Sequence, residues 1–495
     1  MATETARLMN DHKVQEFISE DYNYHLEDWE KIRDCISGER AIKKRSTRYL
    51  PMLPGHHKNI LKYRAYLERA PFYNACQRTL EGLVGSIFRR DPVFLNLTDE
   101  QKRALPWNKS MTRDGEDFTT TATAAATEVI AMGRYGILLD RGSSDNAPLF
   151  AATYKAEHIL TYSTRTINGR EHLDMVALYE RQRHRSTANP LSWEYEEKIR
   201  VLELDENNQY FQWIWPDVNA RTYPRRNGAL LNFIPFIFIG PKSLSPQIQK
   251  SLLLDIANMN LSHFRSYAAL EHGRHFTAMP VYVAKYDQDT ASPTATPNDT
   301  VNSDDEGTPT YELSADAVWE MGANDEAMVL EYRGAGLKYI ENGLEKKEAQ
   351  IQALGGRLIS AVKGAPAQAA VSYDLQSLGD TALLLSVSRN LGKAFTKLMR
   401  WWLWWDGTTA QPADTTLDED LPTIRFSTNF NEQRITPREL RSMQSIYERG
   451  LLPIDVLYHT FHEAGILPNN LTLDQYKALL SDPEQVPALD DRPPG

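Results

Sequence analysis

The sequence predicts an α+β fold, in which helical regions flank an antiparallel sheet and two long helices carry a small β-containing module. Three observations predict it. Apolar residues recur at three- and four-residue steps towards both ends of the chain, short apolar or alternating runs fill residues 135–239, and an acidic segment separates two long helical patterns. The chain has 495 residues, of which 41% are hydrophobic, and this length predicts about two to four structural units.

The N-terminal part is predicted to be mostly helical. Apolar side chains at helical spacing indicate helices over about 12–36, 57–69 and 71–87. The last of these opens with Pro71, whose missing N–H is tolerated in a first turn. Asp114 is the candidate cap of a further helix that runs to Met132.

Residues 135–239 change to a strand pattern. Turn-forming pairs such as Asn168-Gly169, Asn207-Asn208 and Asn227-Gly228 separate the runs, which favours an antiparallel sheet. The runs are 137–139, 175–179, 199–204, 211–215 and 233–239.

Two long helices are predicted in the middle of the chain. Ser245-Pro246 is a helix start, and the apolar face over 246–272 ends at Gly273, the candidate stop. The second helix, 338–361, carries Ile and Leu in a near-heptad series in which Lys347 takes one polar place. Such a narrow apolar stripe suits the packing of helix against helix.

An acidic segment, 280–337, lies between these helices. It begins and ends with strand-like runs, 281–283 and 328–330, and its centre, 290–309, is rich in Ser, Thr, Pro and Asp. This composition predicts a flexible loop. The two helices therefore carry a small acidic β module out from the body and back.

The charge of the chain is divided between segments. The net charge of −11 disfavours a nucleic-acid partner if it is uniform, because duplex DNA is a dense line of negative charge. It is not uniform: residues 31–69 hold 11 basic and 3 acidic residues, a balance of +8, whereas residues 285–335 hold 2 basic and 12 acidic residues, a balance of −10. The two segments are either solvated faces or surfaces for different partners.

After the second long helix, Gly355-Gly356 indicates early fraying, or else a hinge or a close backbone approach, because two glycines disfavour a helix by about 2 kcal/mol. A loop of small residues is predicted over 362–374.

The next helix, 375–405, is nearly all apolar, and its tryptophans at 401–405 predict burial by several neighbours, with other subunits as one source. The basic stripe on this helix would face acidic partners or DNA, and consists of Arg389, Lys393, Lys397 and Arg400.

The C-terminal part is predicted to hold one strand, 423–426, followed by short helices. Thr436-Pro437 and Thr472 open capping boxes, in which a hydroxyl and a side chain three residues later cap the first turn. The tail, 481–495, is rich in Pro and Asp and is expected to lie on the surface.

Cys35 and Cys76 cannot form a disulfide framework and are interpreted as free thiols in a reducing compartment. The N-terminus lacks the basic-then-apolar order of a signal peptide. The most apolar stretch, 382–405, is interrupted by Arg and Lys, so no membrane span is predicted. We expect an intracellular soluble protein.

The sequence contains no recognised motif for catalysis. It has no G-x-x-x-x-G-K-[ST] phosphate loop, no Gly-X-Ser-X-Gly nucleophile elbow and no complete dinucleotide fingerprint. His272 and His275 are interpreted as a surface pair, because no Cys or carboxylate cluster completes a metal site. Asp418-Glu419-Asp420 is interpreted as a solvated loop, with divalent-ion binding as the alternative. The protein is therefore not expected to be an enzyme, and no catalytic residue, cofactor or metal site is predicted.

The order of the predicted elements resembles that of the portal proteins of tailed bacteriophages. Five strings are also similar to a portal-related phage family long catalogued without an assigned function. They are Tyr49-Leu50-Pro51, residues 63–75 (YRAYLERAPFYNA), 80–85 (LEGLVG), 87–92 (IFRRDP) and 348–358. The resemblance covers most of the chain in order, and is weakest over 290–309.

This resemblance implies a portal-like architecture. Its parts would be an N-terminal mixed α/β wing (1–244), a first stem helix (245–279), a clip (280–337), a second stem helix (338–361), a tunnel loop (362–374), a long wing helix and strand (375–430), and a C-terminal helical crown and tail (431–495).

The resemblance also implies a function. Twelve copies would form a ring at the portal vertex of the capsid, assembled in the host cytoplasm and retained in the virion, as the channel for genome packaging and ejection. The implied partners are other copies of the chain, double-stranded DNA in the channel, the terminase large subunit and a head–tail adaptor at the clip, and the major capsid and scaffold proteins, with no membrane.

Candidate DNA-channel residues follow from this arrangement. Each stem lysine has an alternative explanation as a helix charge that pairs with Glu341, Glu345 or Glu348. The candidates are Lys363 and Gln368 at the tunnel loop, and Lys338, Lys346, Lys347 and Arg357 along the stem.

The candidate residues for binding partners at the clip are acidic. An acidic lining would repel phosphates, so that DNA slides rather than sticks. These residues are Asp304, Asp305, Glu306, Glu312 and Asp316.

The basic segment 31–69 is predicted to contact capsid or scaffold surfaces, or packaged DNA. Tyr49, Tyr63 and Tyr66 interleave its charges. Such tyrosines either assist nucleic-acid binding or anchor helices in a core.

Two other classes of function remain open on sequence. One is a different structural head protein, such as a minor capsid protein, against which the two-helix excursion argues. The other is a metal-dependent nucleic-acid-processing enzyme, which a nuclease assay would reveal.

Overall fold

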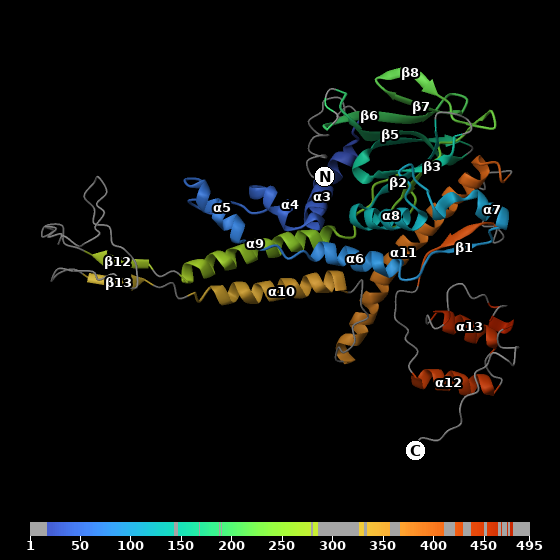
Figure 1. Ribbon diagram of the computed structural model, residues 1–495. Helices are drawn as coiled ribbons and strands as arrows, with labels where there is room; N and C mark the ends of the chain where they lie inside the picture. The colour runs from blue at the N-terminus through green and yellow to red at the C-terminus, as the bar shows by residue number, and fades with distance from the viewer. Residues whose placement is uncertain are drawn as a thin grey trace. The chain divides into compact units, whose positions relative to one another are not determined.

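We describe the protein from a computed structural model (Figure 1). The structure describes residues 17–142, 147–167, 169–187, 189, 191–278, 281–285, 326–330, 334–356, 367–409, 421–428, 437–449, 453–463, 467, 473 and 476–478. The chain divides into two compact units, which we call the larger and the smaller unit. The larger unit comprises residues 1–44, 73–261 and 349–495, and the smaller unit comprises residues 45–72 and 262–348.

The larger unit is mixed α+β, as the sequence predicts. Its helices are α3 (Glu20–Ser37), α4 (Glu39–Lys44), α6 (Ala75–Ile87), α7 (Asp99–Ala104), α8 (Phe118–Met132), α11 (Ala367–Trp405), α12 (Pro437–Glu448) and α13 (Ile454–Glu463). Its strands are β1 (Val93–Leu95), β2 (Tyr135–Arg141), β3 (Leu149–Lys155), β4 (Ile159–Ile167), β5 (Arg170–Arg185), β6 (Trp193–Leu204), β7 (Tyr210–Trp215), β8 (Asp217–Thr222), β9 (Arg225–Arg226), β10 (Ala229–Leu230), β11 (Phe236–Ile239) and β14 (Thr423–Arg425).

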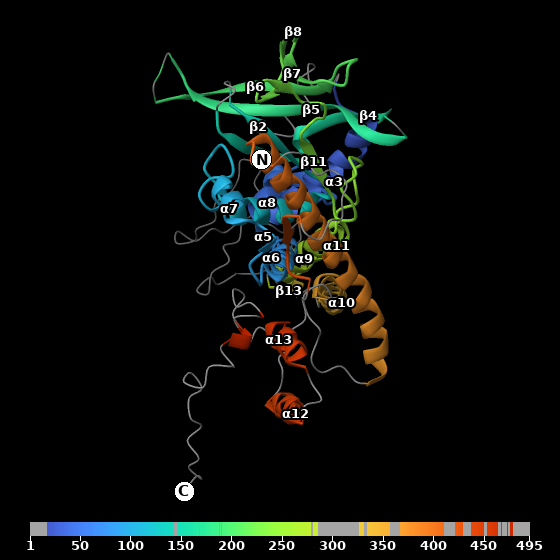
Figure 2. The ribbon, with the colours of Figure 1, turned by 90° about the vertical axis from the view of Figure 1, so that its right-hand side faces the viewer.

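The antiparallel sheet region predicted over 135–239 is confirmed, and it divides into separate sheets. A five-stranded sheet has the order β4-β5-β6-β7-β8, and a three-stranded sheet has the order β11-β2-β3. Figure 2 shows the long strands β5 and β6 running side by side. Asn227 and Gly228 both have positive φ and form the predicted turn, between β9 and β10.

Helix α11 forms the centre of the core of the larger unit. It packs against α8, β11 and β14, and Trp402 packs edge-on against Trp107 at 5.8 Å between ring centroids. The indole Nε1 of Trp405 donates to the carbonyl of Arg225 at 3.0 Å. Trp401, Trp402 and Trp405 are each no more than 3% exposed. Neighbours within the same chain therefore bury these three tryptophans, whereas Trp404 is half-buried.

The N-terminus of α6 is fixed by a side chain from a distant segment. The sequence predicts a start at residue 71, but the helix begins at Ala75, with Asn74 as its cap. Asn260 is fully buried, and its Oδ1 accepts the N–H groups of Ala75 (3.1 Å) and Cys76 (3.3 Å). Because these N–H groups find partners across the fold, the first turn starts there rather than at the proline.

Helix α8 also starts later than predicted. Its cap is Asp117 and not Asp114, because the Asp117 carboxylate accepts the N–H of Thr120 at 2.8 Å.

Helix α11 starts earlier than predicted. The loop expected over 362–374 is wrong for 367–374, where the chain is already helical. Ala367, Gln368 and Ala369 are good helix formers, and Pro366 precedes them, so local propensity accounts for this start.

The two long helices predicted in the middle of the chain are present as α9 (Leu254–Thr277) and α10 (Leu337–Gly356). The predicted start of the first, at residue 246, is wrong. Before α9, the Ser251 hydroxyl donates to the Ala131 carbonyl at the end of α8, and the Leu252 N–H donates to the carbonyl of Ile130. These bonds tie the segment before α9 to α8, so the helix begins only at Leu254.

Two glycines of these helices, Gly273 and Gly355, mark close approaches. Gly273 does not stop α9, which continues to Thr277; a Cβ at Gly273 would lie 2.4 Å from Leu337 Cδ2. At Gly355 a Cβ would lie 2.6 Å from Thr79 Oγ1 of α6. Of the two explanations open for Gly355-Gly356, the geometry supports close approach at Gly355.

Candidate functional site: the helix pair α9–α10 and its strands

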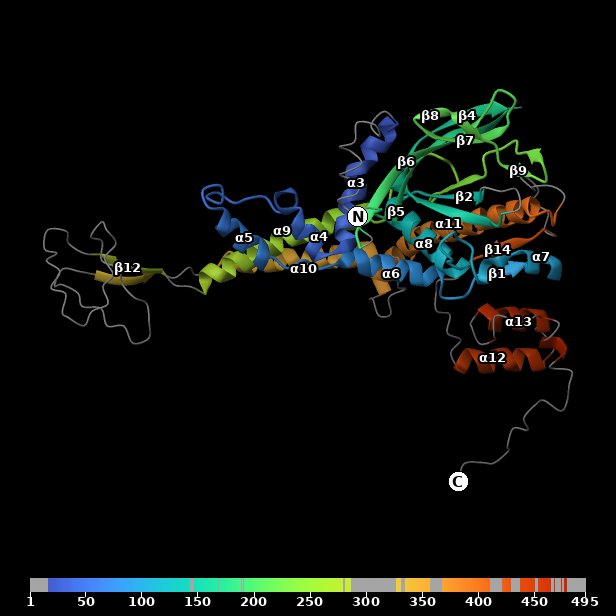
Figure 3. The same ribbon diagram turned by 45° about the horizontal axis from the view of Figure 1, so that its top comes forward.

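The smaller unit contains one excursion of the chain. After α9 ends at Thr277, the chain forms β12 (Val281–Lys285), returns as β13 (Glu326–Leu330) and enters α10 at Leu337. The two strands pair in antiparallel register from Val281↔Leu330 to Lys285↔Glu326. Figures 1 and 3 show α9 and α10 side by side, with the two strands beyond their ends.

Polar contacts hold α9 and α10 together along their length. Arg274 donates to Glu341 at 2.7 Å and to Glu271 at 2.8 Å. Further along the pair, Glu348 Oε1 lies 3.1 Å from Nε2 of the buried His263. The smaller unit therefore pairs these helices by ion pairs and hydrogen bonds.

Lys347 belongs to this pairing. Its ammonium donates to the Ser262 carbonyl at 3.1 Å and to the Ser266 hydroxyl at 2.6 Å. Burial, and to a lesser extent the charge of Arg265, lower the pKa of Lys347. In the folded chain the ammonium donors of Lys347 are therefore directed at α9, and its role as a DNA contact stays a prediction. The sequence contained one signal for this bonding to α9: Lys347 takes a polar place in the otherwise apolar near-heptad series.

Some of the other candidate residues lie within the part of the chain that the structure describes, and the rest lie outside it. Lys338 and Lys346 are exposed on α10. Gln368 lies in the first turn of α11, where the structure describes the backbone alone. Arg357, Lys363 and the acidic clip candidates Asp304, Asp305, Glu306, Glu312 and Asp316 lie outside the described residues.

The tyrosines of the basic segment anchor it within the smaller unit. Tyr63 is 2% exposed and donates its hydroxyl to the Leu50 carbonyl at 2.9 Å, and the Tyr49 carbonyl accepts from Arg265 of α9 at 3.0 Å. Tyr63 and Tyr66 come from helix α5 (Ile60–Arg69). Of the two explanations for these tyrosines, the structure supports core anchoring.

A cluster of histidines, which the sequence did not indicate, lies beside these tyrosines. The ring of His272 packs against Tyr66 at 4.9 Å and His56 at 6.1 Å between centroids. Burial, with smaller contributions from Arg69, His56 and His275, lowers the pKa of His272. His272 is thus half-buried and packs against ring neighbours of the smaller unit.

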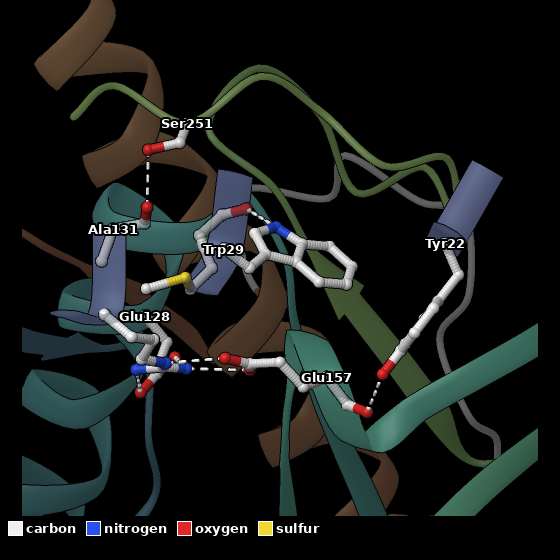
Figure 4. Close-up of polar contacts among 8 residues, drawn as sticks. Tyr22, Trp29, Glu128, Ala131, Glu157 and Ser251 are labelled. Atoms are coloured by element: carbon white, nitrogen blue, oxygen red, sulfur yellow. Dashed lines mark hydrogen bonds and ion pairs between the residues drawn. The ribbon is translucent and has the colours of Figure 1, made fainter. Parts of the chain in front are cut away.

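A buried ion cluster lies in the larger unit (Figure 4). The Arg33 guanidinium bonds Glu128 at 2.6 Å and Glu157 at 2.7 Å. Burial raises the pKa of Glu157, but the charge and hydrogen bonds of Arg33 outweigh burial and leave the pKa lowered. Both carboxylates are engaged by Arg33, so this cluster ties α3 to α8 rather than offering a general base.

The described residues provide no metal centre: no three of their His, Cys, Asp and Glu side chains gather closely enough to hold an ion. Asp418-Glu419-Asp420 lies outside them. Within the same described part of the chain, no helix has the length and apolar character to cross a membrane.

Two residues of the basic stripe on α11 have partners that the structure describes. Arg400 donates to the Pro422 carbonyl at 3.0 Å and to the Thr423 hydroxyl, beside β14. The Lys397 ammonium lies 4.6 Å from the centroid of the Trp401 ring. Arg389 and Lys393 are exposed and form no ion pair with a described carboxylate.

A family match falls on these helices. The model of a family described as a domain of unknown function (DUF4055) matches residues 252–406, which run from the start of α9 to the end of α11. No curated protein matches the sequence.

The solved structures that are similar to the chain include two from gene transfer agent particles. One is described as the virion of a native gene transfer agent particle; it has 10% identity and a TM-score of 0.38, over 79% of this chain and 90% of that chain. The other is described as the neck of an empty gene transfer agent particle; it has 11% identity and a TM-score of 0.38, over 77% of this chain and 88% of that chain.

Proposed function

We propose that this chain is a structural protein of a phage-like particle, and specifically a portal-type subunit whose copies form a ring through which double-stranded DNA passes. The observation that carries the proposal is the excursion through α9, the paired strands β12 and β13, and α10. In this proposal the two paired helices would be the stem, and the strand pair would be part of the clip, that the sequence resemblance implies.

The chemistry of the described stem residues is compatible with passage rather than tight binding. Lys338 and Lys346 are exposed on α10, whereas Lys347 is engaged with α9. Because each phosphate contact adds to affinity, a few exposed lysines per subunit would guide a moving duplex without arresting it. An acidic clip, from the −10 balance of 285–335, would repel phosphates at the mouth.

The remaining roles belong to the same proposal. Lys363 and Gln368 would lie near the DNA at the tunnel loop, and the clip would dock the terminase large subunit during packaging and the adaptor afterwards. The ring would contain twelve copies and sit at the portal vertex of the capsid.

The test is the oligomeric state of the purified full-length chain, measured by negative-stain microscopy and mass photometry over a range of salt and protein concentrations. We expect a ring with an axial hole and a mass near twelve chains. A monomer under all conditions contradicts the proposal, and cleavage of DNA in the presence of divalent cations would favour the enzyme alternative.

A second experiment tests the tunnel loop in assembled phage-like particles that contain substituted chains. Lys363→Ala combined with Gln368→Ala should leave the ring intact and impair packaging or retention of DNA. Packaging and retention at the level of the unsubstituted chain would remove these two residues from the mechanism.

A further inference from the structure

The outer halves of β5 and β6 form a two-stranded ribbon beyond the rest of their sheet. The pairing of β4 with β5 stops at Leu178, and the pairing of β7 with β6 starts at Ile199. Residues 180–185 and 193–198 continue to pair with each other alone, among the residues that the structure describes. We call these two segments the β5–β6 ribbon; Figure 2 shows both strands continuing side by side.

One face of the β5–β6 ribbon combines arginines with aromatic rings. Side chains alternate between faces along a strand, and the pairs Arg183↔Tyr195 and Arg185↔Trp193 set the register. The odd-numbered residues therefore share a face. The Arg183 guanidinium lies 3.8 Å from the centroid of the Trp193 ring, and the Arg181 guanidinium lies 3.8 Å from that of Tyr195.

This face is exposed and basic. Trp193 is 47% exposed and Tyr195 is 49% exposed, so two neighbouring rings lie at the surface of the same face. The face carries one carboxylate, Glu197, whose Oε1 lies 3.6 Å from Arg181. Arg183 and Arg185 form no ion pair with a described carboxylate.

The opposite face differs in charge. Glu194 and Glu196 lie there, 3.5 Å from His184 and 3.0 Å from Lys198 respectively. An anionic partner would therefore bind the arginine face alone.

We propose that the arginine face of the β5–β6 ribbon docks in a groove of double-stranded DNA, with Arg183 and Arg185 on phosphates. The major groove is about 12 Å wide and admits a two-stranded β-ribbon. The Trp193 ring holds the Arg183 guanidinium at 3.8 Å and lies 5.7 Å from that of Arg185. The N–H edge of a guanidinium held over a ring can bond phosphate oxygens in a bidentate manner.

Shape favours DNA over an acidic protein segment as the partner. A two-stranded ribbon that extends beyond its sheet has dimensions that a DNA groove admits, whereas an extended acidic peptide would add along a strand edge and leave the stacked arginines unused. This surface adds a DNA-binding site to the proposed function, but does not require a ring.

The experiment uses the full-length chain and a short fluorescein-labelled duplex of mixed sequence, with anisotropy titrations at several salt concentrations. Arg183→Gln combined with Arg185→Gln should weaken binding and reduce the slope of log K against log salt by about 0.9 for each phosphate that the variant no longer neutralises. The matched control is Lys102→Gln with Arg103→Gln, which removes the same charge from exposed positions of α7 and should bind like the unsubstituted chain. Far-UV circular dichroism checks that each variant folds.

Three results would overturn the inference: an unchanged slope in the ribbon variant, an equal reduction in the control, or arginine-dependent binding of poly-glutamate in preference to the duplex. Arg183→Lys with Arg185→Lys should retain the salt slope, because the charges remain, while binding more weakly than the unsubstituted chain. If the chain forms rings but the arginine substitutions do not weaken DNA binding, this inference is contradicted and the proposed function is not. Ribbon-dependent binding by a chain that never forms rings would support it and contradict the proposed function instead.

Discussion

At the scale of single residues, His272 is the titratable group with the clearest consequence. Its ring packs between Tyr66, His56 and Phe276, and its burial disfavours the charged imidazolium. The lowered pKa means that the unfolded chain binds a proton at a higher pH than the folded chain does. The contribution of neutral His272 to the free energy of unfolding is therefore fully present above about pH 6.5. It is lost as the pH falls towards the pKa that His272 has in the folded chain.

We expect the chain to unfold at a lower temperature at about pH 5 than at about pH 7.5, and His272→Gln to reduce this difference. Thermal unfolding followed by circular dichroism across this range measures both. The control is His172→Gln, at an exposed position of β5, which should leave the pH dependence as it is. Identical pH dependence in the His272→Gln and unsubstituted chains would show that His272 does not carry the effect.

At the scale of elements, the C-terminus of α8 is held by segments from distant parts of the chain. Trp29 Nε1 from α3 donates to the Met132 carbonyl at 2.9 Å, and Ser251 donates to Ala131 (Figure 4). The helix ends at Gly133, whose φ is +77°. The carbonyls that a helix end leaves without partners are thus satisfied by α3 and by the segment before α9.

Gly133→Ala should destabilise the larger unit well beyond the cost of a positive φ, which is about 1–2 kcal/mol for a residue with a Cβ. A Cβ at Gly133 would lie 2.0 Å from the backbone oxygen of Gln249, which cannot move without shifting the chain before α9. Chemical denaturation measures the decrease in the free energy of unfolding.

Gly115→Ala is the matched comparison, because Gly115 also has a positive φ, +86°, but no atom within 4 Å of its added Cβ. Its destabilisation should stay near the cost of φ alone. Equal destabilisation in the two variants would mean that the close approach at Gly133 is relieved cheaply.

At the scale of the whole molecule, the pairing of β12 with β13 allows a clean test of the acidic segment. Lys285 and Glu326 are directly paired, so an Asn-Gly turn can replace residues 286–325 and close a hairpin. We expect this deletion to preserve folding and ring formation and to abolish docking of the terminase and adaptor, since it removes all five clip candidates. Normal packaging by the deleted chain would contradict the assignment of the clip, and loss of the ring would place the segment in assembly instead.

The spacing of apolar residues along the chain was enough to predict many of the helices and strands. The strand runs at 175–179, 199–204 and 211–215 lie within β5, β6 and β7, and the near-heptad series lies within α10. Short-range patterns suffice here because each element has a face that must be buried.

Element ends and partners were harder to predict. Strand β1 pairs with β14, more than three hundred residues away, and α6 starts where Asn260 caps it. No local pattern contains such pairings, because the partner is chosen by the fold.

In the candidate site, too, the features set by local sequence were predictable and those set by distant partners were not. The excursion of two helices around an acidic segment was predictable, because its length, charge balance and apolar stripes are all local properties of the chain. The engagement of Lys347 with Ser262 and Ser266 was not, since an exposed and a bonded lysine look alike in sequence.

The sequence by itself determined the α+β composition, the long helices and the separation of charge between 31–69 and 285–335. The tertiary structure alone decided which charges remain exposed: it turned Lys347 towards α9 and left Arg183 and Arg185 stacked on the outer β5–β6 ribbon. The physical reason is that a charge takes its role from the groups within a few ångströms of it, and folding brings those groups from distant parts of the chain.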